Sequence, residues 1–285
     1  MNPDLLTAPS GMVYPLWQCG SGAPLLLLHG FTGSHETWRH VIPHLSTNHV
    51  VLTLDLPGHG RSELPMSRPW NFASILGDLA WLIASLPDGA ADVLGYSMGG
   101  RLALALAATH PERVRKLVLE SASPGIANEQ ERQERQQSDE RLADRLLEHG
   151  LAAFVAEWEH LPMWQSQATL DEADRVRQRQ IRLGHTASGL AASLRATGTG
   201  AQPSYWEHLA TLRPPTLLIA GARDDKFARI AAAMHEVIPD SRLETVPDAG
   251  HAIHLEQTDR YVHHLSTFLN QPANSEMHAQ RSQSD

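Results

Sequence analysis

Ser97, Asp224 and His251 are the side chains whose types and order in this sequence could activate an alcohol. Ser97 is the centre of G-Y-S-M-G at 95–99, which follows an apolar stretch at 91–94 and precedes a helix-forming stretch at 101–109. In that context G-x-S-x-G forms a nucleophile elbow, a tight strand-to-helix turn that strains the serine and needs glycines to avoid collisions. The turn exposes the hydroxyl at the positive end of a helix. The sequence therefore predicts an activated serine.

The partners of this serine are predicted from the ends of two later elements. An apolar strand pattern at 215–220 is followed by G-A-R-D-D, and Asp224 stands just past the strand end, where a triad carboxylate belongs. Asp225 is the alternative acid. His251 ends P-D-A-G-H at 247–251, a glycine-containing loop before a helix expected to begin near residue 255. His254 is the alternative base.

An oxyanion hole is predicted from an earlier loop together with the elbow. An apolar strand pattern at 25–28 runs into H-G-F-T-G at 29–33. The backbone N–H groups of Phe31 and Met98 are the expected donors to a developing negative charge. Serine, acid and histidine follow one another in the α/β-hydrolase order, each at the carboxyl end of a predicted strand. The sequence therefore predicts an α/β-hydrolase fold.

Alternating strand and helix patterns indicate a mostly parallel sheet with helices on both faces. We expect strands at 12–17, 25–28, 50–54, 91–94, 116–119, 216–220 and 242–246. We expect helices at 36–45, 72–85, 99–109, 227–237 and 255–269, with Ser34 and Asn71 as caps of the first two. The G-H-G at 58–60 lacks an immediately following helix, so we interpret it as a tight loop beside the site.

The alternation stops between about 123 and 202, where leucine and tryptophan recur at helical spacing among Arg, Glu and Gln. We interpret 123–202 as a helical cap inserted over the carboxyl edge of the sheet, excluding water from the pocket. The α/β-hydrolase core then comprises residues 1–122 and 203–270. The polar stretch 271–285 is expected to be a disordered tail.

Composition narrows the class of protein. The chain has 285 residues with a net charge of −9, which argues against a general nucleic-acid binder. Its one cysteine, Cys19, excludes an intrachain disulfide, and no apolar run approaches a membrane span. The N-terminus lacks the pattern of a signal peptide, so we expect a cytoplasmic location. No metal-binding motif or P-loop occurs, and no metal or cofactor is expected.

Arg101 is an unusual residue beside the elbow. It lies four positions after Ser97, so both side chains face the same side of the predicted helix. A cation in the first turns of a helix opposes its dipole at a cost of roughly 0.3–1 kcal/mol, which suggests a compensating anion. That anion could be a substrate or a structural acid from the cap. With inward-pointing cap arginines, Arg101 would form a cation-lined pocket for a small molecule with two or more carboxylates.

Several segments together resemble the family of 2-succinyl-6-hydroxy-2,4-cyclohexadiene-1-carboxylate synthases of menaquinone and phylloquinone biosynthesis. They are G-Y-S-M-G-G-R at 95–101, L-E-S-A-S-P-G at 119–125, R-Q-Q-S-D at 135–139, 196–203 and G-A-R-D-D-K-F at 221–227. The similarity extends from about 24 to 270. It implies a cofactor-free lyase that removes a proton from a cyclohexene carboxylate carrying enolpyruvyl and succinyl groups and eliminates pyruvate.

The resemblance also implies roles for individual residues. Ser97, Asp224 and His251 would be the triad, with the Ser97 oxygen acting as a general base and not as a nucleophile. The residues that would bind substrate are Tyr96, Arg101, Arg135, Trp158 and Arg182. Arg179 replaces Arg182 if the register of the cap differs.

Two other classes of protein share parts of this pattern. A serine carboxylesterase or a carbon–carbon bond hydrolase would use the same triad. A ligand receptor would keep the pocket without the chemistry, although an intact triad and oxyanion hole argue against it. The sequence leaves the oligomeric state open and is compatible with a monomer.

Overall fold

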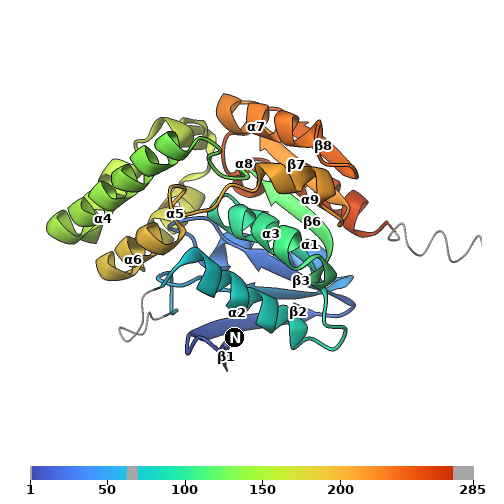
Figure 1. Cartoon of the computed structure of the whole chain (residues 1–285). Helices are drawn as coiled ribbons and strands as arrows, with labels where there is room; N and C mark the ends of the chain where they lie inside the picture. Colours follow the sequence, from blue (N-terminus) through green and yellow to red (C-terminus); the bar gives the residue numbers. More distant parts are fainter. Residues whose placement is uncertain (1, 63–69, 272–285) are drawn as a thin grey trace, which may run out of the picture.

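The computed structural model describes residues 2–62 and 70–271 as a curved eight-stranded sheet flanked by helices (Figure 1). The sheet has the order β1-β2-β4-β3-β5-β6-β7-β8. Its strands are β1 (Asp4–Thr7), β2 (Val13–Gly20), β3 (Ala23–Leu28), β4 (His49–Leu54), β5 (Ala91–Tyr96), β6 (Val114–Glu120), β7 (Thr216–Gly221) and β8 (Ser241–Val246). Strands β1, β2 and β4 pair antiparallel, and the pairs from β4 to β8 are parallel, which confirms the predicted sheet type.

The described helices occupy both faces of the sheet and the long connection after β6. The α-helices are α1 (Ile42–Leu45), α2 (Phe72–Ala84), α3 (Met98–Thr109), α4 (Glu129–Trp158), α5 (Glu172–Leu183), α6 (Ala187–Thr197), α7 (Asp225–His235), α8 (Ile253–Glu256) and α9 (Thr258–Leu269). Short 3-10 helices are η1 (His35–Trp38), η2 (Pro111–Arg113), η3 (Pro162–Thr169) and η4 (Trp206–Thr211).

The parallel register brings distant loops to one edge of the sheet. Leu28 pairs with Gly95, Tyr96 with Glu120, and Gly221 with Val246, so β3, β5, β6, β7 and β8 end together. The loops after β3, β5, β7 and β8 are those that were predicted to hold the reacting groups. Strands β3 and β5 are buried on both faces, and their apolar runs form the centre of the core. A rigid layer therefore supports the site from below.

The predicted caps of the first two helices are confirmed. The Ser34 side chain accepts a hydrogen bond from the Glu36 N–H, and the Asn71 side chain accepts one from the Ser74 N–H. Three element predictions need correction. Strand β1 was not predicted, because its residues are mostly exposed and lack an apolar alternation.

A single helix at 36–45 was wrong: the segment divides into η1 and α1. Pro43 lies in the first turn of α1, where it cannot donate a backbone hydrogen bond toward Arg39, so a helix cannot run through. A single helix at 255–269 was also wrong, because Gln257 is non-helical (φ −141°, ψ 55°) and separates α8 from α9.

Residues 123–202, which we call the cap, hold α4, η3, α5 and α6 and no strand among the residues described there. Helix α4 packs on α6, and Leu146, Phe154 and Leu190 belong to a small hydrophobic cluster separate from the core. In Figure 1 these helices lie together beyond one end of the sheet. The division into core and cap as domains stays a prediction. The predicted tail lies outside the described residues except for Gln271.

Candidate active site

The elbow holds Ser97 in a conformation that the chain accepts only because glycines surround it. Ser97 has φ 51° and ψ −108°, in the region that L-residues rarely adopt. A Cβ on Gly99 would lie 2.1 Å from the Leu28 carbonyl oxygen, and one on Gly95 would lie 2.4 Å from the Gly99 carbonyl oxygen. The first turn of α3 therefore lies against the end of β3 and starts directly after the serine.

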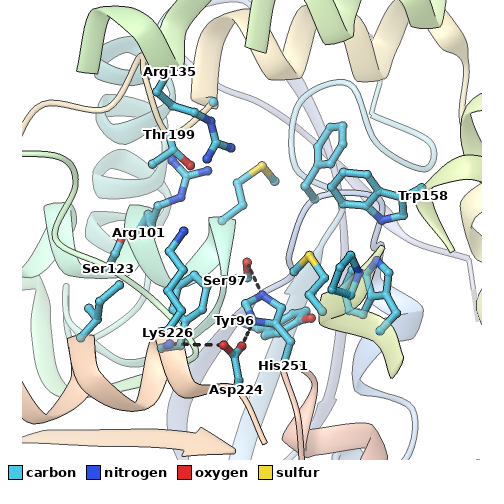
Figure 2. Close-up of a pocket in the computed structure, with 18 of the residues that line it drawn as sticks. Tyr96, Ser97, Arg101, Ser123, Arg135, Trp158, Thr199, Asp224, Lys226 and His251 are labelled. Carbon is cyan, nitrogen blue, oxygen red and sulfur yellow. Dashed lines mark hydrogen bonds and ion pairs between the residues drawn. The ribbon is translucent and has the colours of Figure 1, made fainter. Parts of the chain in front are cut away.

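Three side chains from three loops meet at this point (Figure 2). Ser97 Oγ lies 3.0 Å from His251 Nε2, and His251 Nδ1 lies 2.7 Å from Asp224 Oδ2. Asp224 is the N-cap of α7, where its other oxygen accepts a 3.3 Å hydrogen bond from the Phe227 N–H. A carboxylate that accepts from Nδ1–H leaves Nε2 free to take the serine proton.

Glu256 fixes the loop that carries His251. Its carboxylate accepts hydrogen bonds from the N–H groups of Gly250 (2.7 Å) and Ala252 (3.2 Å), the residues on either side of the histidine. His251 itself is 1% exposed. Glu256 ends the short helix α8, which is separate from α9. The prediction of a single helix at 255–269 did not include this separate turn.

The two alternatives left open by the sequence lie elsewhere. The Asp225 side chain is 84% exposed, at the mouth of the cavity. His254 is buried beneath the sheet edge, where its Nδ1 lies 2.8 Å from Glu120 Oε1. Neither lies in the hydrogen-bonded chain from Asp224 to Ser97.

The 29–33 loop faces the serine. Its Gly30 packs against the ring of Tyr96, because a Cβ there would lie 2.7 Å from that ring and 3.4 Å from the Ser97 Cβ. Thr32 has a positive φ of 64°. Among the described residues the Phe31 N–H has no hydrogen-bond partner, although its neighbours on both sides are hydrogen bonded. A free donor beside the serine is the arrangement that an oxyanion needs.

A cavity of about 810 Å³ opens above these groups, between the sheet edge and the cap. Its lining includes Ser97, His251, Phe31, Met98, Tyr96, Arg101, Arg135, Trp158 and Lys226. The structure thus brings all but one of the predicted site residues to a single cavity, and the exception is Arg182.

Arg101 and Arg135 line one wall of the cavity (Figure 2). Arg101 is 8% exposed, and its Nη1 donates a 3.1 Å hydrogen bond to Gln202 Oε1. Burial, helped by the nearby Arg135 charge, lowers the pKa of Arg101 to about 10. Arg135 pairs with Asp139 at 2.7 Å. Among the described residues Arg101 has no acidic hydrogen-bond partner, but the charge of Asp139 in the cap acts on it and opposes the lowering of its pKa.

The opposite wall is aromatic. Trp158 stacks on Phe154 with centroids 5.4 Å apart and meets Phe31 edge-on, also at 5.4 Å. The indole N–H groups of Trp158 and Trp164 are buried and have no hydrogen-bond partner in the described structure.

Arg182 does not line the cavity. It lies behind Trp164, with its guanidinium carbon 5.2 Å from the ring centroid, and its Nη1 donates to Glu159 Oε1 at 3.2 Å. Burial lowers the pKa of Arg182, and Glu159 opposes that shift. Arg179 pairs with the same Glu159 from the exposed side. Of the two, Arg182 is the inner one, but the indole of Trp164 stands beside it.

Sequence reasoning missed Lys226 and Trp164 as cavity residues. The Lys226 side chain is exposed, lies 5.4 Å from the Phe227 ring centroid and has no acidic partner within the described residues. Its place directly after the two candidate acids was a signal that could have found it. Trp164 carried no such signal, because the 3-10 helix η3 that presents it has no periodic pattern.

No group of metal-ligating side chains occurs among residues 2–62 and 70–271. None of the helices described there combines the length and hydrophobicity that crossing a bilayer requires.

Comparison with known proteins places the chain in a family. Residues 23–258 match the family model described as the alpha/beta hydrolase fold. The chain therefore belongs to the α/β-hydrolase family, as the elbow and the order of serine, acid and histidine predicted.

Particular relatives narrow the class. A Bacillus subtilis (strain 168) protein, provisionally named a 2-succinyl-6-hydroxy-2,4-cyclohexadiene-1-carboxylate synthase, is 41% identical over 93% of this chain and 97% of its own. The synthase of that name from Escherichia coli O1:K1 is 31% identical over 86% and 93%. The structure of MenH from S. aureus superposes with a TM-score of 0.86 at 36% identity, covering 90% and 97%. Within the α/β-hydrolases, the chain belongs to the family of these synthases.

Proposed function

We propose that this protein eliminates pyruvate from 2-succinyl-5-enolpyruvyl-6-hydroxy-3-cyclohexene-1-carboxylate and gives 2-succinyl-6-hydroxy-2,4-cyclohexadiene-1-carboxylate, in menaquinone or phylloquinone biosynthesis. The observation that carries the proposal is one cavity that combines a histidine-paired serine with a wall of buried and half-buried cations. Membership of the synthase family supports it. The substrate has three carboxylates, which matches an excess of positive charge.

The proposed reaction begins with removal of a carbon-bound proton. The Ser97 oxygen takes the proton from the ring carbon next to the succinyl ketone while its own hydroxyl proton passes to His251 Nε2, 3.0 Å away. The C–H electron pair moves into the ketone oxygen, which becomes an enolate. Asp224 stabilises the imidazolium through Nδ1–H.

The enolate then expels the leaving group. The N–H groups of Phe31 and Met98 would hold the enolate oxygen, and losing one donor of this kind typically costs roughly 2.7–4 kcal/mol. The electron pair returns through the ring, the carbon–oxygen bond to the enolpyruvyl group breaks, and the departing pyruvate enolate is protonated to pyruvate. The proton accumulated on His251 balances that step. No cofactor enters the scheme.

Binding would be divided between the two walls. We assign Arg101 and Arg135 to substrate carboxylates, and Tyr96 and Trp158 to the ring. Arg182 acts through Trp164 in this proposal, since the indole separates it from the cavity. Residues 123–202 would serve as the cap that excludes water. We expect a cytoplasmic protein that acts on a small molecule without a nucleic-acid or membrane partner.

The test is a coupled assay on freshly generated pathway intermediate. Pyruvate release followed with lactate dehydrogenase should rise together with the ultraviolet absorbance of the conjugated diene, in equal amounts. A p-nitrophenyl ester serves as the control substrate. Rapid ester hydrolysis without pyruvate release would assign the protein to the carboxylesterases or carbon–carbon bond hydrolases, and absence of turnover on both would favour a ligand receptor.

A further inference from the structure

Three buried histidines lie beneath the 29–33 loop, which we call the oxyanion loop, and none of them belongs to the triad. His29 leaves β3, His59 lies in the loop after β4, and His185 lies in the cap between α5 and α6. Their exposures are 0%, 1% and 7%. The rings meet edge to face, with centroids 5.0 Å apart for His29 and His59 and 5.3 Å for His59 and His185. They form one row from the sheet to the cap.

Each ring in this row accepts one backbone hydrogen bond and donates one. His29 Nε2 accepts from the Leu56 N–H at 2.9 Å, and its Nδ1 lies 2.8 Å from the Gly30 carbonyl. His59 Nε2 accepts from the Thr32 N–H at 3.2 Å. A ring with one acceptor and one donor nitrogen is neutral imidazole. Burial lowers the pKa of all three histidines, that of His29 to about 4, which agrees with neutral rings.

His185 is the member that belongs to the cap. Its Nδ1 accepts a 2.9 Å hydrogen bond from the Gly60 N–H, and its Nε2 lies 2.9 Å from the Thr32 carbonyl, to which it donates. The cap touches the same loop a second time. A Cβ on Gly58 would lie 2.2 Å from the Gly189 carbonyl oxygen, so the two backbones are in direct contact. This end of the cap therefore has little freedom against the 55–60 loop.

Thr32 thus has both its backbone groups held by histidines, one from the core and one from the cap. The residue before it, Phe31, has the free N–H that the proposed oxyanion hole uses. Thr32 also has the left-handed φ of 64°, which without these two bonds would be costly for a β-branched residue.

We propose that His185 is a positioning residue that joins the cap to the oxyanion loop. The position of the cap relative to this loop then sets the direction of the Phe31 N–H. This rests on the proposed function for its catalytic consequence. Rate depends on donor placement, and a displacement of 1 Å in a site can cost about 100-fold. A shift of the α5–α6 end of the cap relative to the oxyanion loop would weaken enolate stabilisation without removing any group that touches substrate.

Two substitutions of similar shape each remove one of the two hydrogen bonds of His185 and keep the other. In His185→Asn the amide oxygen takes the place of Nδ1, which keeps the Gly60 bond and loses the Thr32 bond. In His185→Gln the amide nitrogen takes the place of Nε2, which keeps a donor to Thr32. We expect kcat for pyruvate release to fall about 100-fold in the Asn variant, with KM nearly unchanged, and the Gln variant to recover most of the loss. His149→Gln, an exposed histidine of α4, is the matched control.

Hydrogen exchange provides a readout that needs no substrate. The amides of 29–33 should exchange faster in His185→Asn than in the wild type or in His185→Gln, while the central strands keep their protection. Equal kcat values and equal exchange at 29–33 in all variants would overturn the proposal. If the wild type released no pyruvate, the lyase function would be wrong, and the exchange measurement would still decide the role of His185.

Discussion

Two parts of the same cavity are held in different ways. One is the edge of the sheet with Ser97 and His251, which we call the reacting edge, and the other is the wall that carries the cations. Ser97 lies in a strained turn and is hydrogen bonded to His251, whose side chain is 1% exposed and is hydrogen bonded to Asp224. On the cation-bearing wall Arg101 is buried, whereas the Arg135 side chain is 41% exposed and Lys226 is exposed too. Proton transfer requires hydrogen-bond distance, whereas charges attract over several ångströms, so only the first task requires rigid placement. The difference predicts different kinds of sensitivity to mutation.

The largest loss is expected at the reacting edge. In Ser97→Ala, kcat for pyruvate release should fall by up to about 10⁶-fold, because the group that removes the proton is gone. KM should change little, since the substrate carboxylates are held on the other wall. Steady-state kinetics would check both values, and Ser188→Ala, an exposed serine of α6, is the control. Activity near wild type would remove the serine from the mechanism.

Substituting each of the two candidate acids in turn tests how precisely the reacting edge places its carboxylate. Asp224→Asn keeps the shape but favours the wrong histidine tautomer, so we expect a loss in kcat of about 10⁴-fold. Asp225→Asn, one residue further on and exposed, should stay within about twofold, as surface substitutions do. Reversed results from the two variants would mean that α7 begins one residue later when substrate is bound.

The cation wall should respond through binding. Arg101→Ala is expected to lower kcat/KM about 10- to 100-fold, mainly by raising KM, because a hydrogen bond to a charged group contributes about 1.5–3 kcal/mol. Lys226→Ala should have a smaller effect that shrinks in high salt. Melting temperatures measured alongside would show whether the fold survives. Unchanged kinetics in a folded Arg101→Ala protein would exclude the anion subsite.

The smallest expected effect is on stability. It comes from the three buried histidines beneath the 29–33 loop and not from either wall of the cavity. The pKa values of His29, His59 and His185 are lowered in the folded state, to about 4 for His29, from the ordinary value of 6.5. Their stabilisation is therefore present above pH 6.5 and is lost as the pH falls toward 4. Urea unfolding at pH 7, 6 and 5 should show this decline, with a shallower slope in His185→Gln. Equal slopes would mean that His185 titrates alike in both states.

Much of the reacting edge could be predicted, because its parts have fixed positions in sequence. The elbow needs glycines beside Ser97, and the triad acid follows a strand end, so each left a local pattern. The cap arginines left no such pattern. Arg182 and Arg179 differ by three residues on one helix. Both pair with Glu159, and Trp164 stands beside Arg182, so neither arginine lines the cavity.

The helix predictions failed where a single residue outweighed the pattern. Pro43 interrupts the apolar periodicity of 36–45, and Gln257 breaks the helix after His251. The second break allows Glu256 to hold the histidine loop, a contact over six residues that periodicity does not encode.

By itself the sequence determined the alternation of strands and helices, the order of serine, acid and histidine, and the helical character of 123–202. These follow from apolar periodicity and from turns that few residue types can make. Only the tertiary structure decided which carboxylate meets His251, which arginines face the cavity, and that His185 reaches the oxyanion loop. Such contacts join residues far apart in the chain, and their distances are set by how helices and sheet pack together. No local pattern of residues records that packing.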